Sequence, residues 1–202
     1  MSNNKASKFK LKPLNVAIAG IVAALYVVLC LPFASFSFGM VQFRLAEVLT
    51  VMPAFSSMAI PGVFLGCLLS NILNPNNLGL IDIFGGSLAT LIAAMATYWL
   101  AKPYRRIILA ERRPDYSKIE ANTWKKRFMR FVMLFPPILF NAVIVGSYLP
   151  YLLLEHTPTT LEIIGSIASI FLSQSLVIYV LGMGVVLALE KAKFPVEGKE
   201  SK

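Results

Sequence analysis

The sequence predicts an all-α integral membrane protein with six transmembrane helices and both termini in the cytoplasm. Three observations support this fold class. The chain is 57% hydrophobic, which exceeds the roughly 45–50% apolar usage of soluble domains. Its mean hydropathy is +0.71. Its basic residues are confined to segments that alternate with apolar runs, as in multi-pass membrane proteins.

The basic residues mark the segments that we expect on the cytoplasmic side. All but one of the 19 lysines and arginines lie within residues 5–12, 102–130 and 191–202, and the exception is Arg44. The positive-inside rule assigns such segments to the cytoplasm. The net charge of +9 does not indicate nucleic-acid binding, because that function needs a basic face on a folded soluble domain, and the apolar runs leave hardly any such domain.

The first predicted helix covers residues 13–31 and begins with proline, which helices tolerate in their first turn. The apolar run from residue 14 to about residue 38 is too long for a cleaved signal peptide, so we expect the helix to be retained. Small residues four apart give this helix a flat face, which suits packing within the chain and contact with a partner protein equally well. These residues form two overlapping pairs, Ala19/Ala23 and Gly20/Ala24.

The number of membrane crossings decides how residues 44–73 fold. If the N-terminus and residues 102–130 are both cytoplasmic, an even number of crossings separates them, and residues 13–31 and 83–100 supply two. Residues 44–73 are therefore predicted to cross twice, as short helices that turn near residues 53–61. Helices of roughly 11–16 residues cover only about 16–24 Å of the ~30 Å hydrocarbon core, so their polar ends would lie below the membrane surface.

The remaining chain is predicted to supply three longer helices. Residues 71–80 form a turn, and Asp82 is the predicted N-cap of a helix that ends near Trp99, with Gly85 and Gly86 allowing close approach in its first turn. The last two helices cover residues 128–152, interrupted at Pro136-Pro137, and residues 160–191. The predicted organisation is a basic tail (1–12), a membrane domain (13–191) that includes a basic cytoplasmic loop (102–127), and a second cytoplasmic tail (192–202).

This topology gathers polar residues on the outer side. Arg44 and Glu47 are three residues apart, so they share one helical face, and charged residues within membrane segments are usually functional. They predict a pocket that opens outward. Two alternatives stay open: Arg44 and Glu47 pair with each other at the interface, or Arg44 extends to lipid headgroups. Further candidates for this pocket or for bonds between helices are Asn71, Asn74, Asp82, Asn141, Tyr148 and Gln174.

The sequence contains no recognisable catalytic set, metal site or cofactor site. It has one histidine, His156, and its two cysteines, Cys30 and Cys67, lie in apolar helices without a metal-binding or redox spacing. The phosphate-binding pattern GxxxxGK[ST] is absent from the sequence. We therefore expect a non-enzymatic chain, and any ATP that drives its work is expected to be hydrolysed by partner subunits.

Three stretches resemble the QueT family: QFRLAEVLT at residues 42–50, IPGVFLGC at residues 60–67, and GLIDIFGGSLATL at residues 79–91. Members of this family are substrate-binding S-components of energy-coupling factor (ECF) transporters for queuosine precursors. The resemblance implies a multi-pass plasma-membrane protein with an S-component-like bundle. It also implies a complex with a transmembrane coupling protein and two ATPase subunits, in which the small residues of the first helix, with Ala19/Ala23 as the pair that carries the resemblance, contact the coupling protein.

The resemblance implies a 7-deazaguanine as the substrate, with preQ1 favoured over preQ0 and queuine. A carboxylate accepts the adjacent donors on the guanine edge, and a second acid suits the aminomethyl cation of preQ1, so Glu47 and Asp82 would divide these roles. Arg44 would orient a carboxylate or donate to the base carbonyl, and Asn71, Asn74 and Asn141 are further amide partners. Aromatic side chains would stack on the flat base; the candidates are Phe43, Phe84 and Tyr148.

Other classes of membrane protein remain as alternatives. The main one is a stand-alone secondary transporter for a nucleobase-like or vitamin-like molecule, which would work without ATPase partners. An intramembrane enzyme would need catalytic residues that the sequence does not offer, and a scaffold would gain no thermal stability from any ligand.

Overall fold

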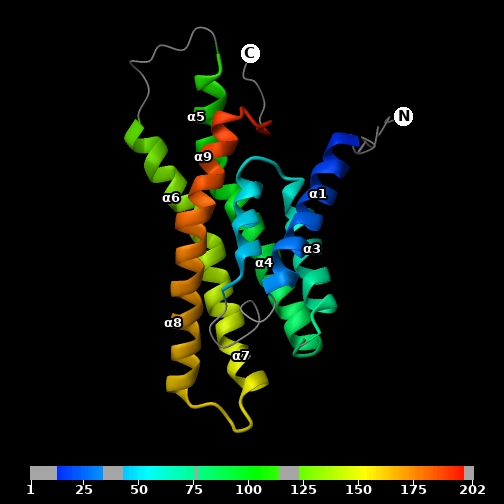
Figure 1. The fold of residues 1–202 in the computed structure, drawn as a ribbon. Helices are drawn as coiled ribbons and strands as arrows, with labels where there is room; N and C mark the ends of the chain where they lie inside the picture. Colours follow the sequence, from blue (N-terminus) through cyan, green and yellow to red (C-terminus); the bar gives the residue numbers. More distant parts are fainter. Residues whose placement is uncertain (1–12, 34–42, 76, 114–122, 198–202) are drawn as a thin grey trace, which may run out of the picture.

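The computed structural model describes residues 13–33, 43–75, 77–113 and 123–197, and the regular elements of these residues are all helical (Figure 1). Four helices in the described part are long and apolar enough to span a membrane: Asn15–Phe33, Leu80–Leu100, Thr123–Leu153 and Thr160–Lys191. In chain order the elements are α1 (Pro13–Cys30), η1 (Leu31–Phe33), η2 (Leu45–Ala54), α3 (Ala59–Leu73), α4 (Leu80–Leu100), α5 (Lys102–Glu111), α6 (Thr123–Phe140), η4 (Asn141–Val145), α7 (Gly146–Leu153), α8 (Thr160–Leu176), η5 (Val177–Gly182) and α9 (Met183–Lys191).

Two short helices lie between the first and second long spans, as the parity of crossings predicts. The first is η2, with 10 residues in 3₁₀ geometry, and the second is α3, with 15 residues. The division of residues 44–73 into two short helices is therefore confirmed, whereas their passage through a bilayer stays a prediction. The start of α1 and the end of α9 lie at the same end of the bundle, which we call the terminal end (Figure 1).

Glycines on α3 bring this helix very close to α1. A Cβ atom at Gly62 would lie 2.8 Å from the carbonyl oxygen of Ala19, and one at Gly66 would lie 2.5 Å from the Cβ of Tyr26. Side chains at these positions would not fit, so the small residues of α3 serve packing within the chain. This contact holds Tyr26 in place, and the Tyr26 hydroxyl donates to the buried carboxylate of Glu47.

Replacing Gly66 with alanine is expected to destabilise the fold by about 1–3 kcal/mol, the usual cost of overpacking a tight contact. The added methyl group would displace the Tyr26 side chain or separate α1 from α3. The matched control is Gly165→Ala, since Gly165 lies on α8 and has no atom within 4 Å of its Cβ position. Thermal unfolding in detergent would show the difference, and an unchanged midpoint for Gly66→Ala would contradict the close contact.

The start of α4 differs from the sequence prediction. Asp82 is not an N-cap: α4 begins at Leu80, its N-cap is Gly79, and Asp82 lies in the first helical turn. Gly79 adopts a φ of 90°, which glycine reaches without steric cost, so the chain can turn sharply before the helix. The Asp82 carboxylate is thereby free of a capping role and faces the interior, where it is 1% exposed.

The prediction of a loop over residues 102–127 is wrong for its first part, which forms α5. Tyr104 and Ile108 lie on one face of this helix and pack into the core. Arg105 is buried, and its Nη1 donates to the carbonyl oxygens of Ala54 at 3.2 Å and Tyr98 at 2.8 Å. Arg105 therefore has a structural role, because it ties α5 to the ends of η2 and α4.

The predicted interruption at Pro136-Pro137 is also wrong. Both prolines lie inside α6, which continues to Phe140, and the departure from α geometry follows as the π-helical segment η4. Membrane helices tolerate proline where neighbouring helices and local π adjustments satisfy the freed backbone groups. As a result Asn141, the first residue of η4, takes a position facing the bundle interior, where it is 4% exposed.

Candidate functional site

Polar side chains from five helical segments meet in the interior of the bundle. They come from the start of η2, the end of α3, the start of α4, the π-helical segment η4 and α7. Burying this many polar groups is costly unless they bond one another or a ligand. The residues, which we call the polar cluster, are Arg44 (3% exposed), Glu47 (0%), Asn71 (1%), Asp82 (1%), Asn141 (4%) and the half-buried Tyr148.

Gly86 lies at the point where three of these side chains converge. A Cβ atom there would lie 3.2 Å from Nδ2 of Asn71 and 3.6 Å from both Nη1 of Arg44 and the hydroxyl of Tyr148. At the neighbouring Gly85, a Cβ would lie 2.9 Å from the Tyr148 ring. The prediction that these glycines allow close approach in the first turn of α4 is confirmed, and the approaching groups are those of the cluster.

The Glu47 carboxylate is fully buried and only partly satisfied. Its Oε1 accepts a 2.6 Å hydrogen bond from the Tyr26 hydroxyl on α1, and Asn141 lies beside it. Within the described residues its Oε2 accepts no hydrogen bond, and Nδ2 of Asn141 donates none. A buried acceptor and a buried donor of this kind call for partners, and either a small shift of Asn141 toward Glu47 or a bound molecule would supply them.

The acidic side chains of the cluster favour a donor-rich ligand. Arg44 interacts electrostatically with Asp82 and Glu47, so one basic side chain faces two acidic ones. The Asp82 carboxylate accepts a 3.0 Å hydrogen bond from the Tyr148 hydroxyl. The alternative in which Arg44 extends to lipid headgroups is wrong, because its side chain is buried within the bundle.

The other predicted binding residues lie less centrally. Asn74 is buried as the C-cap of α3, and its carbonyl oxygen accepts a hydrogen bond from Nδ2 of Asn77. Phe43 is half-buried and directly precedes Arg44. Phe84 is 55% exposed and shares an outward-facing stripe of α4 with Ile81 and Leu88. The structure therefore does not bring Phe84 to the polar cluster, because two residues along a helix from Asp82 turns a side chain to the opposite face.

Sequence reasoning missed two parts of the cluster's support. Tyr26 is not among the candidates that the sequence predicts. A buried tyrosine in an apolar helix needs a hydrogen-bond partner for its hydroxyl, and this need is the signal that points to Tyr26. Cys67 is buried, and its Sγ accepts from Oγ1 of Thr90 at 3.4 Å and from Nδ2 of Asn71 at 3.7 Å. Gln174, a candidate for the pocket or for a bond between helices, is buried on α8, and its Oε1 accepts no hydrogen bond within the described residues.

The small residues of α1 divide into two faces. Ala23 is 9% exposed, and its carbonyl oxygen and that of Ala19 face the glycines of α3, so this pair packs within the chain. Gly20 and Ala24 are exposed, and nothing lies within 4 Å of a Cβ at Gly20. Of the two pairs proposed for contact with a coupling protein, Gly20 and Ala24 are thus the pair that remains accessible.

Comparison with known proteins identifies the family of the chain. The profile of the QueT transporter family matches residues 16–191. A curated relative, the queuosine precursor transporter QueT of Lactococcus lactis subsp. cremoris, is 35% identical over 85 residues, which is 41% of this chain and 48% of the relative. The aligned part thus spans about half of that relative's length, and no solved structure matches the chain.

The family match extends from the first long helix to the last residue of α9, and it includes every member of the polar cluster. The four long apolar helices and the transporter relative make this a multi-pass plasma-membrane protein. The chain therefore belongs to the QueT transporter family, a family of transporters and not of enzymes.

Proposed function

We propose that this chain is the substrate-binding S-component of an ECF transporter and that it binds a 7-deazaguanine precursor of queuosine in the polar cluster. The observation that carries the proposal is the buried Glu47 carboxylate, whose Oε2 accepts no hydrogen bond from the described residues. Membership of the QueT transporter family and the likeness to a queuosine precursor transporter support the substrate class.

The guanine-like edge of the substrate matches the Glu47 carboxylate. This edge presents an N–H and an exocyclic amine as adjacent donors, and a carboxylate accepts both in bidentate fashion. Tyr26 uses one lone pair of Oε1, and an ionised carboxylate offers about four acceptor sites, so both oxygens still have acceptor capacity. A bidentate contact of this kind discriminates between bases by roughly 1–3 kcal/mol.

The second acid of the cluster suits the aminomethyl cation of preQ1, which preQ0 lacks. Asp82 would accept from this cation, and the cluster holds two acidic side chains against one basic side chain, Arg44. Arg44 would donate to the base carbonyl, and Asn71 and Asn141 would bond the remaining polar edge. Phe43 or Tyr148 would stack on the ring, a contact worth about 1–3 kcal/mol per base.

Partner subunits would supply the energy for transport. The chain has no phosphate-binding loop, so we propose that a coupling protein and two ATPase subunits drive reorientation after the substrate is captured from outside. The accessible pair Gly20 and Ala24 on α1 offers a face for the coupling protein. Placement of the start of α1 and the end of α9 at one end of the bundle supports an even number of crossings (Figure 1).

A ligand panel tests the function directly. Purified protein would be melted in the presence of guanine, preQ0, preQ1 and queuine, with preQ1 expected to raise the unfolding midpoint most. At a ligand concentration about 100 times Kd the expected stabilisation is about 2.7 kcal/mol. If no deazaguanine shifts the midpoint, the protein is not a binding subunit for this class. Uptake that persists in cells without the ATPase subunits would instead identify a secondary transporter.

A further inference from the structure

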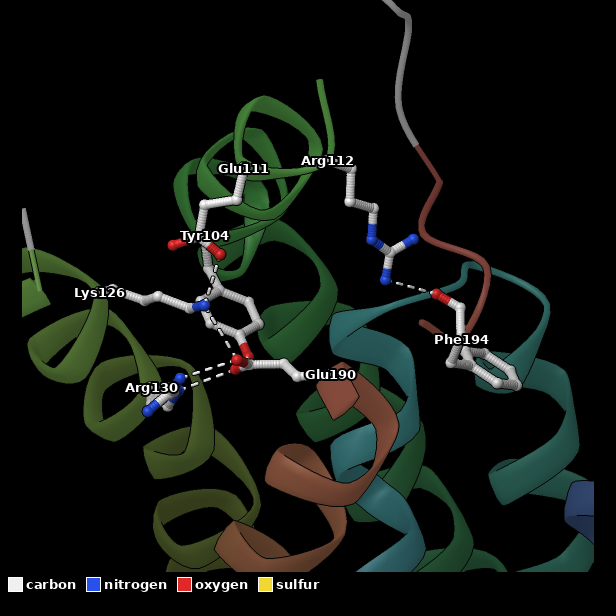
Figure 2. Close-up of polar contacts among 7 residues, drawn as sticks. All are labelled: Tyr104, Glu111, Arg112, Lys126, Arg130, Glu190 and Phe194. Carbon is white, nitrogen blue, oxygen red and sulfur yellow. Dashed lines mark hydrogen bonds and ion pairs between the residues drawn. The ribbon is translucent and has the colours of Figure 1, made fainter. Parts of the chain in front are cut away.

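A second polar site lies at the terminal end of the bundle, remote in sequence from the polar cluster. It is a cavity of about 320 Å³ between α5, α6 and α9 (Figure 2). Neither the family match nor the deazaguanine proposal assigns it a role. The residues that line it are Ile108, Glu111, Arg112, Lys126, Leu187, Glu190, Lys191 and Lys193.

The two acids of this cavity are already neutralised by partners within the chain. Glu190 accepts hydrogen bonds from Nε and Nη2 of Arg130, each at 2.8 Å, and from the Tyr104 hydroxyl. Lys126 bridges the two acids, with its Nζ 2.9 Å from Glu190 and 2.6 Å from Glu111 (Figure 2). Burial, together with the adjacent Glu190 carboxylate, raises the pKa of Tyr104, which keeps its hydroxyl a donor. The carboxylates are therefore not available to hold a cationic ligand.

The remaining cations of the cavity give it a positive charge. Four basic residues and two acidic ones line it. Arg112 is held in place because its Nη2 donates to the carbonyl oxygen of Phe194 at 3.0 Å. Lys191 and Lys193 are exposed and form no ion pair with the residues that the structure describes. An anion is the occupant that this balance of charge favours.

Lys193 occupies a backbone position that normally belongs to glycine. Its φ is 51°. It follows α9 in a helix-ending turn in which the Phe194 N–H donates to the carbonyl oxygen of Leu189 and the Lys193 N–H donates to the carbonyl oxygen of Glu190, both at 3.0 Å. Glycine would take this left-handed conformation without steric cost. A lysine here adds a cation to the cavity despite the backbone strain.

The position of the cavity indicates the source of the anion. It lies where two membrane-spanning helices end, because α6 opens the span Thr123–Leu153 and α9 closes the span Thr160–Lys191. Trp124 and Phe128 are exposed on the first two turns of α6, as expected for side chains at the headgroup level. Leu187 is exposed and also lines the cavity, so one wall of the site is apolar and continues onto the surface of α9.

We propose that this cavity binds the phosphate group of an anionic phospholipid from the cytoplasmic leaflet, with Arg112, Lys191 and Lys193 as its ligands. Basic pockets between membrane helices on the cytoplasmic side bind such headgroups. Leu187 would contact the start of an acyl chain. The bound lipid would link α5 to α9 across the cavity and stabilise the terminal end of the bundle.

The test compares the full-length protein with a double variant, Lys191→Gln and Lys193→Gln, in a neutral detergent. Dioctanoyl phosphatidylglycerol is expected to raise the unfolding midpoint of the unchanged protein, whereas dioctanoyl phosphatidylcholine is not. The double variant is expected to bind phosphatidylglycerol more weakly by roughly fivefold for each lysine removed. The matched control removes two exposed charges of α5 outside the cavity lining, Lys102→Gln and Arg106→Gln. It should retain the full shift.

A third variant, Lys193→Gly, separates a ligand role from a structural one. Without lipid it should be at least as stable as the unchanged protein, because glycine relieves the strained backbone. With phosphatidylglycerol it should show a smaller shift. Equal shifts in the double variant and its α5 control would overturn the site. If inorganic phosphate raises the unfolding midpoint as much as phosphatidylglycerol does at the same concentration, the occupant of the cavity is not a lipid.

Discussion

Replacing Glu47 with glutamine is expected to weaken deazaguanine binding by more than tenfold, or about 1.4 kcal/mol. The buried Oε2 of Glu47 is the acceptor for which the described chain provides no donor. Glutamine presents an amide nitrogen in place of one carboxylate oxygen, so it sets a donor against the donors of the guanine edge. Hydrogen bonds to a charged group contribute about 1.5–3 kcal/mol, which accounts for the expected size of the loss. Calorimetry on purified protein would measure it.

The matched control for this variant is Tyr26→Phe. It removes the 2.6 Å hydrogen bond to Oε1 but leaves the carboxylate intact. We expect it to weaken binding less than Glu47→Gln, because the carboxylate still accepts from the base. Thermal unfolding of both ligand-free variants would separate a folding defect from a lost contact. Unchanged affinity in Glu47→Gln would remove Glu47 from the binding site.

Leucine at both Gly20 and Ala24 is expected to abolish uptake while leaving substrate affinity unchanged. These residues are exposed on α1, and no atom lies within 4 Å of a Cβ at Gly20, so larger side chains fit within the isolated subunit. In the proposed complex the same side chains would prevent close approach of the coupling protein, since contacts between membrane helices depend on small residues. Uptake by whole cells and calorimetry on the purified subunit would be measured in parallel.

Two further variants show whether the α1 effect is specific. Gly165→Leu changes an equally open glycine on α8 and should preserve uptake. Leucine at Ala23, by contrast, should destabilise the subunit itself, because Ala23 is 9% exposed against α3. Normal uptake in the Gly20/Ala24 double variant would refute the coupling role of this face. A loss of substrate affinity in that variant would place the Gly20/Ala24 face of α1 at the binding site instead.

Sequence alone determined the helical membrane class, and it located most of the polar cluster. Segregated basic residues, apolar runs and the parity of crossings are local or countable features, so they predicted two short helices where η2 and α3 lie. A charge inside an apolar segment is costly wherever the segment packs, and this singled out Arg44 and Glu47. The glycines one helical turn after Asp82 likewise indicated the close approach that Gly85 and Gly86 provide.

Only the tertiary structure decided which polar groups meet. Tyr26 contacts Glu47 from 21 residues away, and Tyr148 contacts Asp82 from 66 residues away. Contacts between residues so far apart in the sequence depend on how whole helices pack, and no local sequence pattern predicts this packing. Packing also decides the roles of Phe84 and of the Ala19/Ala23 pair. Phe84 is a residue type that stacks on nucleobases, but its face of α4 points outward. Ala19 and Ala23 have the spacing that suits a partner helix, but α3 already covers them. Spacing along a helix defines a face, and packing decides what that face contacts.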